Sequence, residues 1–107
     1  MAELVVKTDN IIRNIQKLDS YLKNRNIQWS LVSKVLSGDS EFLEKILVPD
    51  VVDRLHSVGD SRVSSLRNIK KVNPEIRTIY IKPPAKQLAK QIVSCADISV
   101  NTSAETI

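Results

Sequence analysis

The feature that most constrains the fold of this chain is a regular alternation between short apolar runs and stretches with helical spacing. The apolar runs begin near residues 4, 27, 54, 76 and 97, so they recur at intervals of 23, 27, 22 and 21 residues. After the first run, Ile11, Ile15, Leu18 and Leu22 fall on one face of a helix. Repeated strand–helix units of this kind predict an α/β fold with parallel strands.

Residues that begin or end helices set the predicted boundaries. Asp9 is expected to cap the first helix, and Pro49 is expected to end the second. The sequence Thr102–Glu105 has a capping-box pattern, but only two residues follow it. We therefore expect residues 1–107 to form one domain, approximately the first five strands of a TIM-type (β/α)8 barrel, truncated at the start of the helix after the fifth strand. The predicted strands are Leu4–Lys7, Ile27–Leu36, Arg54–Val58, Ile76–Lys82 and Asp97–Asn101.

Composition excludes several classes of protein. The single cysteine, Cys95, cannot form an internal disulfide, and no apolar run approaches the ~20 residues that cross a bilayer, so we expect a cytoplasmic protein without a membrane partner. The net charge is +4, but only 4% of residues are aromatic, which argues against nucleic-acid binding. The chain has no nucleotide-binding glycine motif and no Cys/His cluster, so no metal site is predicted.

Lys34 is unusual among the strand ends, which is where ligands of parallel α/β folds bind. It follows Leu31, Val32 and Ser33 near the end of a strand that we expect to be covered on both faces. Burying an ammonium group is costly, so such a lysine is favoured as a neutral amine that can form a Schiff base with a carbonyl group. The spacing is equally typical of a lysine at a strand edge whose charge reaches solvent.

For the remaining candidate positions a structural role is expected, and one segment also has a functional interpretation. Gly59-Asp60-Ser61-Arg62 is either a turn that orients a ligand or a capped turn between a strand and a helix. Core packing is expected for Tyr80 and solvation for Lys82. We expect His56 to be a hydrogen-bonded structural residue in a strand, and Cys95 to be a small packing residue.

Three segments together resemble the N-terminal barrel region of the alanine racemase family, in particular its ornithine racemase-like branch. They are Trp29–Val35 (WSLVSKV), Gly59–Arg62 (GDSR) and Asp97–Ile107 (DISVNTSAETI). The corresponding family pattern is a strand that ends in S/T-K-V, an A-D-S-R turn, and a D-I-S-L/V-N-S/T-x-x-E-T-I stretch. All 107 residues take part in the resemblance.

The resemblance implies an enzyme that uses pyridoxal 5′-phosphate to racemise an amino acid. Lys34 would hold the cofactor as an internal aldimine and act as an acid and base at the substrate Cα. Asp60, Ser61, Arg62 and Asn101 would lie near the cofactor. Ornithine, alanine and other amino acids are all possible substrates.

Two departures limit what the chain is expected to do alone. Better-known members have a tyrosine in the loop after the lysine, and here Val35-Leu36-Ser37-Gly38 supplies none. The family's later strands and C-terminal domain have no counterpart in 107 residues, so the isolated chain is expected to be inactive. A half-barrel also has two open edges, which predict a homodimer or a strand-exchanged oligomer.

Two other functions remain open on the sequence. One is a non-catalytic pyridoxal-phosphate-binding homeostasis protein, although that family favours a G-E-N turn where this chain has Gly59-Asp60-Ser61. The other is a doubly wound signalling receiver that is phosphorylated on Asp60. A receiver needs an acidic pair after its first strand and a lysine after its fifth, whereas the chain has Thr8-Asp9 and Asn101.

Overall fold

Four parallel strands form a single sheet in this protein. The structure is a computed structural model that describes residues 5–36, 38–83 and 85–101. Within these ranges four strands form the sheet; they lie side by side in chain order and all pairs are parallel. They are β1 (Ser30–Val32), β2 (Ser57–Asp60), β3 (Thr78–Tyr80) and β4 (Ile98–Ser99).

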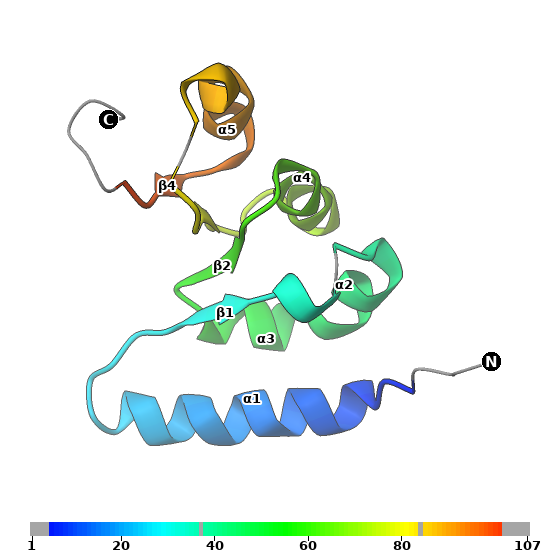
Figure 1. Ribbon diagram of the computed structural model, residues 1–107. Helices are drawn as coiled ribbons and strands as arrows, with labels where there is room; N and C mark the ends of the chain where they lie inside the picture. The colour runs from blue at the N-terminus through cyan, green and yellow to red at the C-terminus, as the bar shows by residue number, and fades with distance from the viewer. Residues whose placement is uncertain (1–4, 37, 84, 102–107) are drawn as a thin grey trace.

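The helices lie along an arc outside the strands (Figure 1). At one end of the arc is α1, at the other is α5, and the remaining helices lie between them. The α-helices are α1 (Thr8–Lys23), α2 (Ser40–Ile46), α3 (Pro49–Arg54), α4 (Val63–Val72) and α5 (Ala89–Cys95). Short 3-10 helices also form at η1 (Lys34–Leu36) and η2 (Lys86–Leu88). None of the helices in the described ranges is both long and apolar enough to span a bilayer.

The order of the strands explains why the helices share one side. Connections between neighbouring parallel strands are nearly always right-handed, so a sheet that grows in one direction receives every crossover on the same face. The single parallel sheet, with helices between successive strands, confirms the predicted α/β fold with repeated strand–helix units. A doubly wound sheet reverses its strand order and has helices on both faces, so the order β1-β2-β3-β4 disfavours the receiver interpretation.

The core lies between the sheet and this layer of helices. Val58 of β2 and Tyr80 of β3 are buried there, with Leu66 and Ile69 of α4 and Ile92 of α5. The α4 helix contacts both central strands. Its apolar side chains recur at three- and four-residue intervals, which places them on the face that meets the sheet.

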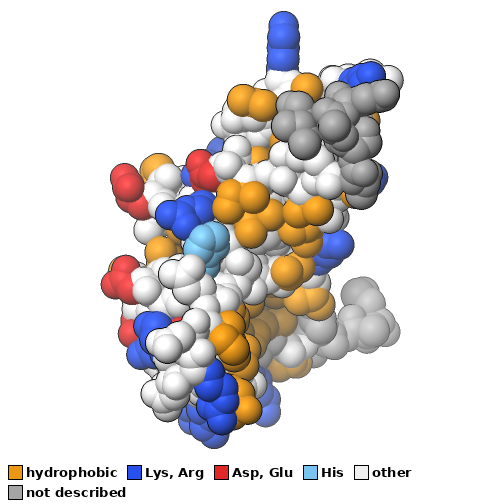
Figure 2. Space-filling view, turned by 90° about the vertical axis from the view of Figure 1, so that its left-hand side faces the viewer, with side chains coloured by type: hydrophobic (Ala, Val, Ile, Leu, Met, Phe, Trp, Pro, Cys, Tyr) orange, Lys and Arg blue, Asp and Glu red, His pale blue; other side chains and the backbone are white. Residues whose placement is uncertain are grey.

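The other face of the sheet has no helix over it in the described part of the chain. The strand register places Val32, Gly59, Ile79 and Ile98 in one row across this face. Val32 is 48% exposed. Figure 2 looks onto this side of the molecule and shows hydrophobic side chains along its middle. We call the side of the sheet that carries this row the open face.

The strands are shorter than the sequence predicts. Val5–Lys7 is not a strand, and Leu4 lies outside the described residues. Of the predicted strand Ile27–Leu36 only the centre pairs with a neighbour, and the chain turns into η1 at Lys34. The predicted strands Ile76–Lys82 and Asp97–Asn101 are likewise reduced to β3 and β4. Apolar composition marks where a strand lies, but only backbone pairing with a neighbour sets its ends.

Three further boundaries differ from those that the sequence predicts. Pro49 lies beyond the end of α2 and begins a further helix, α3. Proline fits the first turn of a helix because its missing N–H needs no partner there. As a result β2 begins at Ser57 rather than Arg54, and His56 precedes the strand. Asp9 lies in the first turn of α1, and Lys7 occupies the N-cap position. The capping box at Thr102–Glu105 lies outside the described residues.

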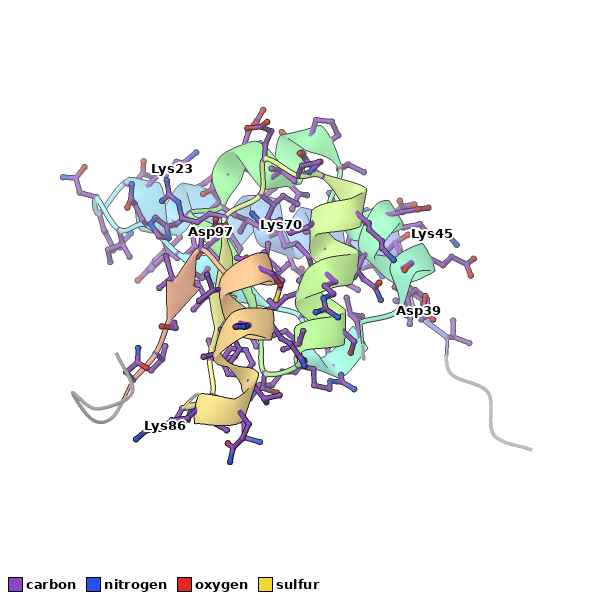
Figure 3. All side chains as sticks on the ribbon, turned by 90° about the horizontal axis from the view of Figure 1, so that it is seen from above. Lys23, Asp39, Lys45, Lys70, Lys86 and Asp97 are labelled. Carbon is purple, nitrogen blue, oxygen red and sulfur yellow. The ribbon has the colours of Figure 1, made fainter. Side chains whose placement is uncertain are left out.

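Asp97 joins the amino end of β4 to α4 and β3. The Lys70 ammonium of α4 lies 2.7 Å from an Asp97 carboxylate oxygen, and the backbone N–H of Thr78 donates to the same oxygen at 2.9 Å. Figure 3 shows Lys70 and Asp97 close together. The hydrogen bond from Lys70, supported by the Thr78 N–H, holds the pKa of Asp97 below its usual value.

Asp19 fixes α1 to the rest of the molecule. Its carboxylate is 1% exposed and accepts hydrogen bonds from the Trp29 indole at 3.0 Å and from Arg54 of α3 at 3.1 Å. The Lys23 ammonium lies 3.2 Å away. Burial acts to raise the pKa of Asp19, but the hydrogen bonds from Trp29, Lys23 and Arg54 outweigh it, so the pKa is lowered.

Replacing Asp19 should therefore destabilise the protein in a pH-dependent way. Asp19→Asn removes a buried charge that accepts three donors, and we expect it to lower the free energy of unfolding by roughly 1–3 kcal/mol at neutral pH. Because folding lowers this pKa, the contribution of Asp19 is fully present above ~4 and is lost as the pH falls below that value. Urea unfolding of both proteins at several pH values measures the difference. A difference that stays constant down to pH ~3 would contradict the assignment.

Candidate functional site

All five residues proposed from the sequence lie just beyond, or at, the carboxyl ends of parallel strands. Lys34 follows β1, Asn101 follows β4, and Asp60, Ser61 and Arg62 stand at the end of β2. Parallel strands end at the same edge of their sheet, so the topology gathers these positions on one side of the molecule. Ligands of parallel α/β folds bind at this edge.

Lys34 itself is exposed, which fits the interpretation of a lysine at a strand edge and differs from the interpretation of a buried amine. The difference has two causes. The strand ends before Lys34, and the sheet is covered on one face only, so the chain beyond β1 is open to solvent. The Lys34 amine is therefore accessible from solution.

Asp60 is fully buried and holds the loop that follows β2. One of its carboxylate oxygens accepts the backbone N–H groups of Ser61 at 2.7 Å and of Arg62 at 3.1 Å. The other accepts the hydroxyl of Ser33, the residue before Lys34, at 3.3 Å. Asp60 thus links the ends of β1 and β2, and its oxygens face this loop rather than solvent.

Ser61 and Arg62 are more accessible than Asp60. The Arg62 guanidinium is 49% exposed, and its Nε lies 3.8 Å from the Asp60 carboxylate. At that distance the half-exposed guanidinium and the buried carboxylate form an ion pair rather than a strong hydrogen bond. Arg62 therefore keeps donors for an anion, and the partly buried Ser61 precedes it at the start of α4.

Asn101 stands apart from the Asp60 loop, on the far side of β3. Its amide donates to the carbonyl oxygen and to the hydroxyl of Ser99, at 3.4 and 2.9 Å. These bonds orient the Asn101 side chain along the end of β4. The structure thus brings Asp60, Ser61 and Arg62 together with Ser33, and places Asn101 two strands away from them.

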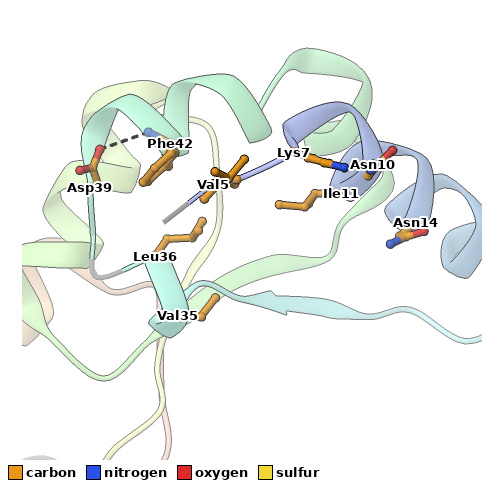
Figure 4. Close-up of a pocket in the computed structure, with 10 residues that line it drawn as sticks. Val5, Lys7, Asn10, Ile11, Asn14, Val35, Leu36, Asp39 and Phe42 are labelled. Carbon is orange, nitrogen blue, oxygen red and sulfur yellow. Dashed lines mark hydrogen bonds between the residues drawn. The ribbon is translucent and has the colours of Figure 1, made fainter. Parts of the chain in front are cut away.

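Beside Lys34 lies a cleft that the sequence did not reveal. It has a volume of about 680 Å³ and lies between the start of α1, the η1 turn and the start of α2. Val35 and Leu36, which directly follow Lys34, line it with Ile11 and Phe42, and Figure 4 shows Ile11, Leu36 and Phe42 around Val5. Lys7 and Asp39 also line it. The only sequence signal was the apolar pair Val35-Leu36 in a loop that otherwise reads as polar.

The turn after η1 is fixed by a glycine and a cap. Gly38 has a φ of +69°, a conformation that favours glycine, and a Cβ there would lie only 2.5 Å from the Ser65 hydroxyl oxygen of α4. Asp39 then caps α2 by accepting the backbone N–H groups of Glu41 and Phe42. Gly38 and Asp39 therefore fix how the chain enters α2 beside α4.

His56 lies at the opposite, amino end of the strands. Its Nε2 lies 2.8 Å from the Arg77 guanidinium, which can only donate, and its Nδ1 lies 3.0 Å from the Ser57 hydroxyl. The expectation of a hydrogen-bonded histidine is confirmed, although His56 precedes the strand rather than lying in it. Among the described residues there is no group of three histidine, cysteine or carboxylate side chains that could bind a metal ion.

No protein-family model, curated protein or solved structure matches this chain. The candidate site is therefore defined by its own geometry and chemistry. It consists of an accessible amine at the end of β1, an arginine and a hydroxyl at the end of β2, and a buried carboxylate that holds the two strand ends together.

Asp60→Ala should destabilise the site and the protein together. The substitution leaves two backbone N–H groups and the Ser33 hydroxyl without their acceptor, so we expect a loss of roughly 1–3 kcal/mol in the free energy of unfolding. Ser61→Ala, at the neighbouring and more exposed position, should change it by about 0.5 kcal/mol or less. Urea denaturation compares the two variants. Equal effects would show that the Asp60 carboxylate does not anchor this loop.

Proposed function

We propose that this chain carries the cofactor-binding part of a pyridoxal-phosphate-dependent amino-acid racemase, in which Lys34 binds the cofactor. The single observation that carries the proposal is the accessible Lys34 amine at the carboxyl end of a parallel strand, next to the strand that Ser61 and Arg62 follow. The resemblance to the alanine racemase family rests on these same segments. We further propose a TIM-type barrel as the complete fold and the cytoplasm as its location.

The residues present fit pyridoxal phosphate in their chemistry. An aldehyde needs a primary amine, which Lys34 supplies, and a phosphate needs cations and hydrogen-bond donors, which Arg62 and Ser61 supply. When bound, the cofactor supplies an electron sink for the carbanion formed at the substrate Cα. Asn101 offers a polar amide at the same edge of the sheet.

The roles of the chain's own residues follow from their positions. Lys34 would hold the cofactor and, once released from it, move a proton to or from Cα. Arg62 and Ser61 would orient the phosphate. Asp60 would act as a positioning residue, because its oxygens hold the Ser61 and Arg62 N–H groups rather than facing a ligand.

A non-catalytic pyridoxal-phosphate-binding protein is the second candidate. The exposure of Lys34 favours it, because an amine in open solvent binds an aldehyde without excluding water from the reaction. The two candidates share the same lysine and differ in turnover. The buried Asp60 disfavours the receiver interpretation, since a phosphate acceptor must be reached from solution.

Reductive labelling tests the proposal directly. The chain is incubated with pyridoxal phosphate, reduced with borohydride and digested, and mass spectrometry locates the modified lysines. We expect Lys34 to be the preferred site, Lys34→Arg to lose most of the labelling, and Lys82→Arg, at the end of β3, to retain it. Equal labelling of the wild-type chain and Lys34→Arg would refute the proposal.

A second comparison tests the phosphate contact. Pyridoxal lacks the phosphate, so Arg62→Gln should reduce labelling by pyridoxal phosphate by roughly ten-fold and leave labelling by pyridoxal unchanged. Equal loss with both aldehydes would mean that Arg62 acts on the fold rather than on the phosphate. Both labelling experiments test binding of the cofactor, which the two candidates share, and not turnover.

A further inference from the structure

The exposed apolar side chains of this protein gather at the two ends of its sheet. On the β1 side they belong to α1, to β1 and to the segments around them; on the β4 side they belong to α5 and to the residue after β4. Between residues 36 and 92, no large hydrophobic side chain among those described is exposed. The exposed apolar residues are Val5, Leu18, Tyr21, Ile27, Val32 and Val35 on the β1 side, and Val93 and Val100 on the β4 side.

Among the residues that the structure describes, the same two ends carry backbone edges of the sheet that pair with no further strand. The N–H of Ser33 donates to β2, so the N–H of Val32, which points the opposite way, faces the outer edge of β1. In the same way the N–H of Val100 donates to Tyr80 of β3, so the N–H of Ser99 faces the outer edge of β4. Unpaired strand edges are templates for pairing with another chain.

We propose that two copies of this chain join edge to edge, β1 of each copy pairing with β4 of the other, to form a closed eight-stranded parallel barrel. Each copy contributes four parallel strands in chain order. Eight strands is the number whose interior side chains fill a closed barrel. A two-fold axis along the barrel keeps all strands parallel and closes the ring after two copies.

The open face suits the interior of such a barrel. Val32, Ile79 and Ile98 are the branched aliphatic residues that fill barrel interiors, and Gly59 of the same row lies against the Ile81 side chain. A Cβ on Gly59 would lie 3.3 Å from Ile81, so the neighbouring side chain already occupies that space. Parallel sheets are covered on both faces in nearly all proteins, and closure would cover this one.

The helices at the ends would meet in the same assembly. Figure 1 places α1 and α5 at opposite ends of the arc, so closure brings α5 of one copy beside α1 of the other. Val93 of α5 is 79% exposed, and Leu18 and Tyr21 are exposed on α1. On a scale of roughly 100 Å² per aliphatic side chain, the eight exposed residues offer about 500 Å² of apolar surface per copy. That is most of the ~800 Å² that each partner buries in a standard interface.

The inference concerns assembly and does not rest on the proposed function. Its test therefore omits the cofactor. Sedimentation equilibrium of the 107-residue chain should give a mass of twice 12.0 kDa at micromolar concentration. A monomer at that concentration would overturn the proposal, whatever the result of the labelling experiment.

Proline substitutions test whether the edges make the contact. Val32→Pro and Ser99→Pro each remove one outward N–H and no bond to the neighbouring strand, and each should weaken the dimer by roughly ten- to hundred-fold. Val32→Thr, which keeps its N–H, should remain dimeric. Two sheets packed face to face use no backbone edge, so a dimer that both proline variants leave intact would refute edge pairing. Circular dichroism checks that each variant is folded, and Ser99→Pro provides the test if Val32→Pro unfolds.

Discussion

The structure depends on the hydrogen bonding of each strand to the next strand in the chain, in parallel. Because right-handed crossovers then bring the helices between the strands to the same side, one face of the sheet is buried under α4 and its neighbours, and the other has no helix over it among the described residues. Because the strands are parallel, their carboxyl ends all lie at the same edge of the sheet. The core, the candidate site and the proposed assembly are three consequences of this one arrangement.

Three buried or half-buried carboxylates tie neighbouring elements together. Asp19 fixes α1 to α3 and to Trp29, Asp97 joins α4 to β3, and Asp60 holds the ends of β1 and β2. Each accepts several donors at once, so the cost of removing the charge from water is offset by charge-assisted hydrogen bonds. The short strands leave few backbone bonds per ladder, which makes these side-chain links important for holding the sheet.

Asp60 also shows that a residue in a sequence motif can hold a loop in place instead of facing the site. The sequence Gly59–Arg62 draws attention to a carboxylate, an hydroxyl and a cation in a turn. In the structure the carboxylate is turned inward, and it is Arg62 that remains half exposed. Lys34 is linked to this loop only through its neighbour Ser33. The chemistry proposed for the site therefore rests on Lys34 and Arg62, with Asp60 maintaining the loop between the two strand ends.

The sequence by itself determined the class of fold, the order of most elements and the edge at which Lys34, Asp60 and Arg62 lie. Periodicity reports which side chains need burial, and Gly38, Asp39 and Pro49 report where the backbone must turn. Only the tertiary structure decided where strands end, which direction Asp60 faces and that Lys34 is exposed. Those properties depend on which neighbour pairs with each strand and on which face a helix covers, and contacts between residues far apart in the chain leave no local pattern in it.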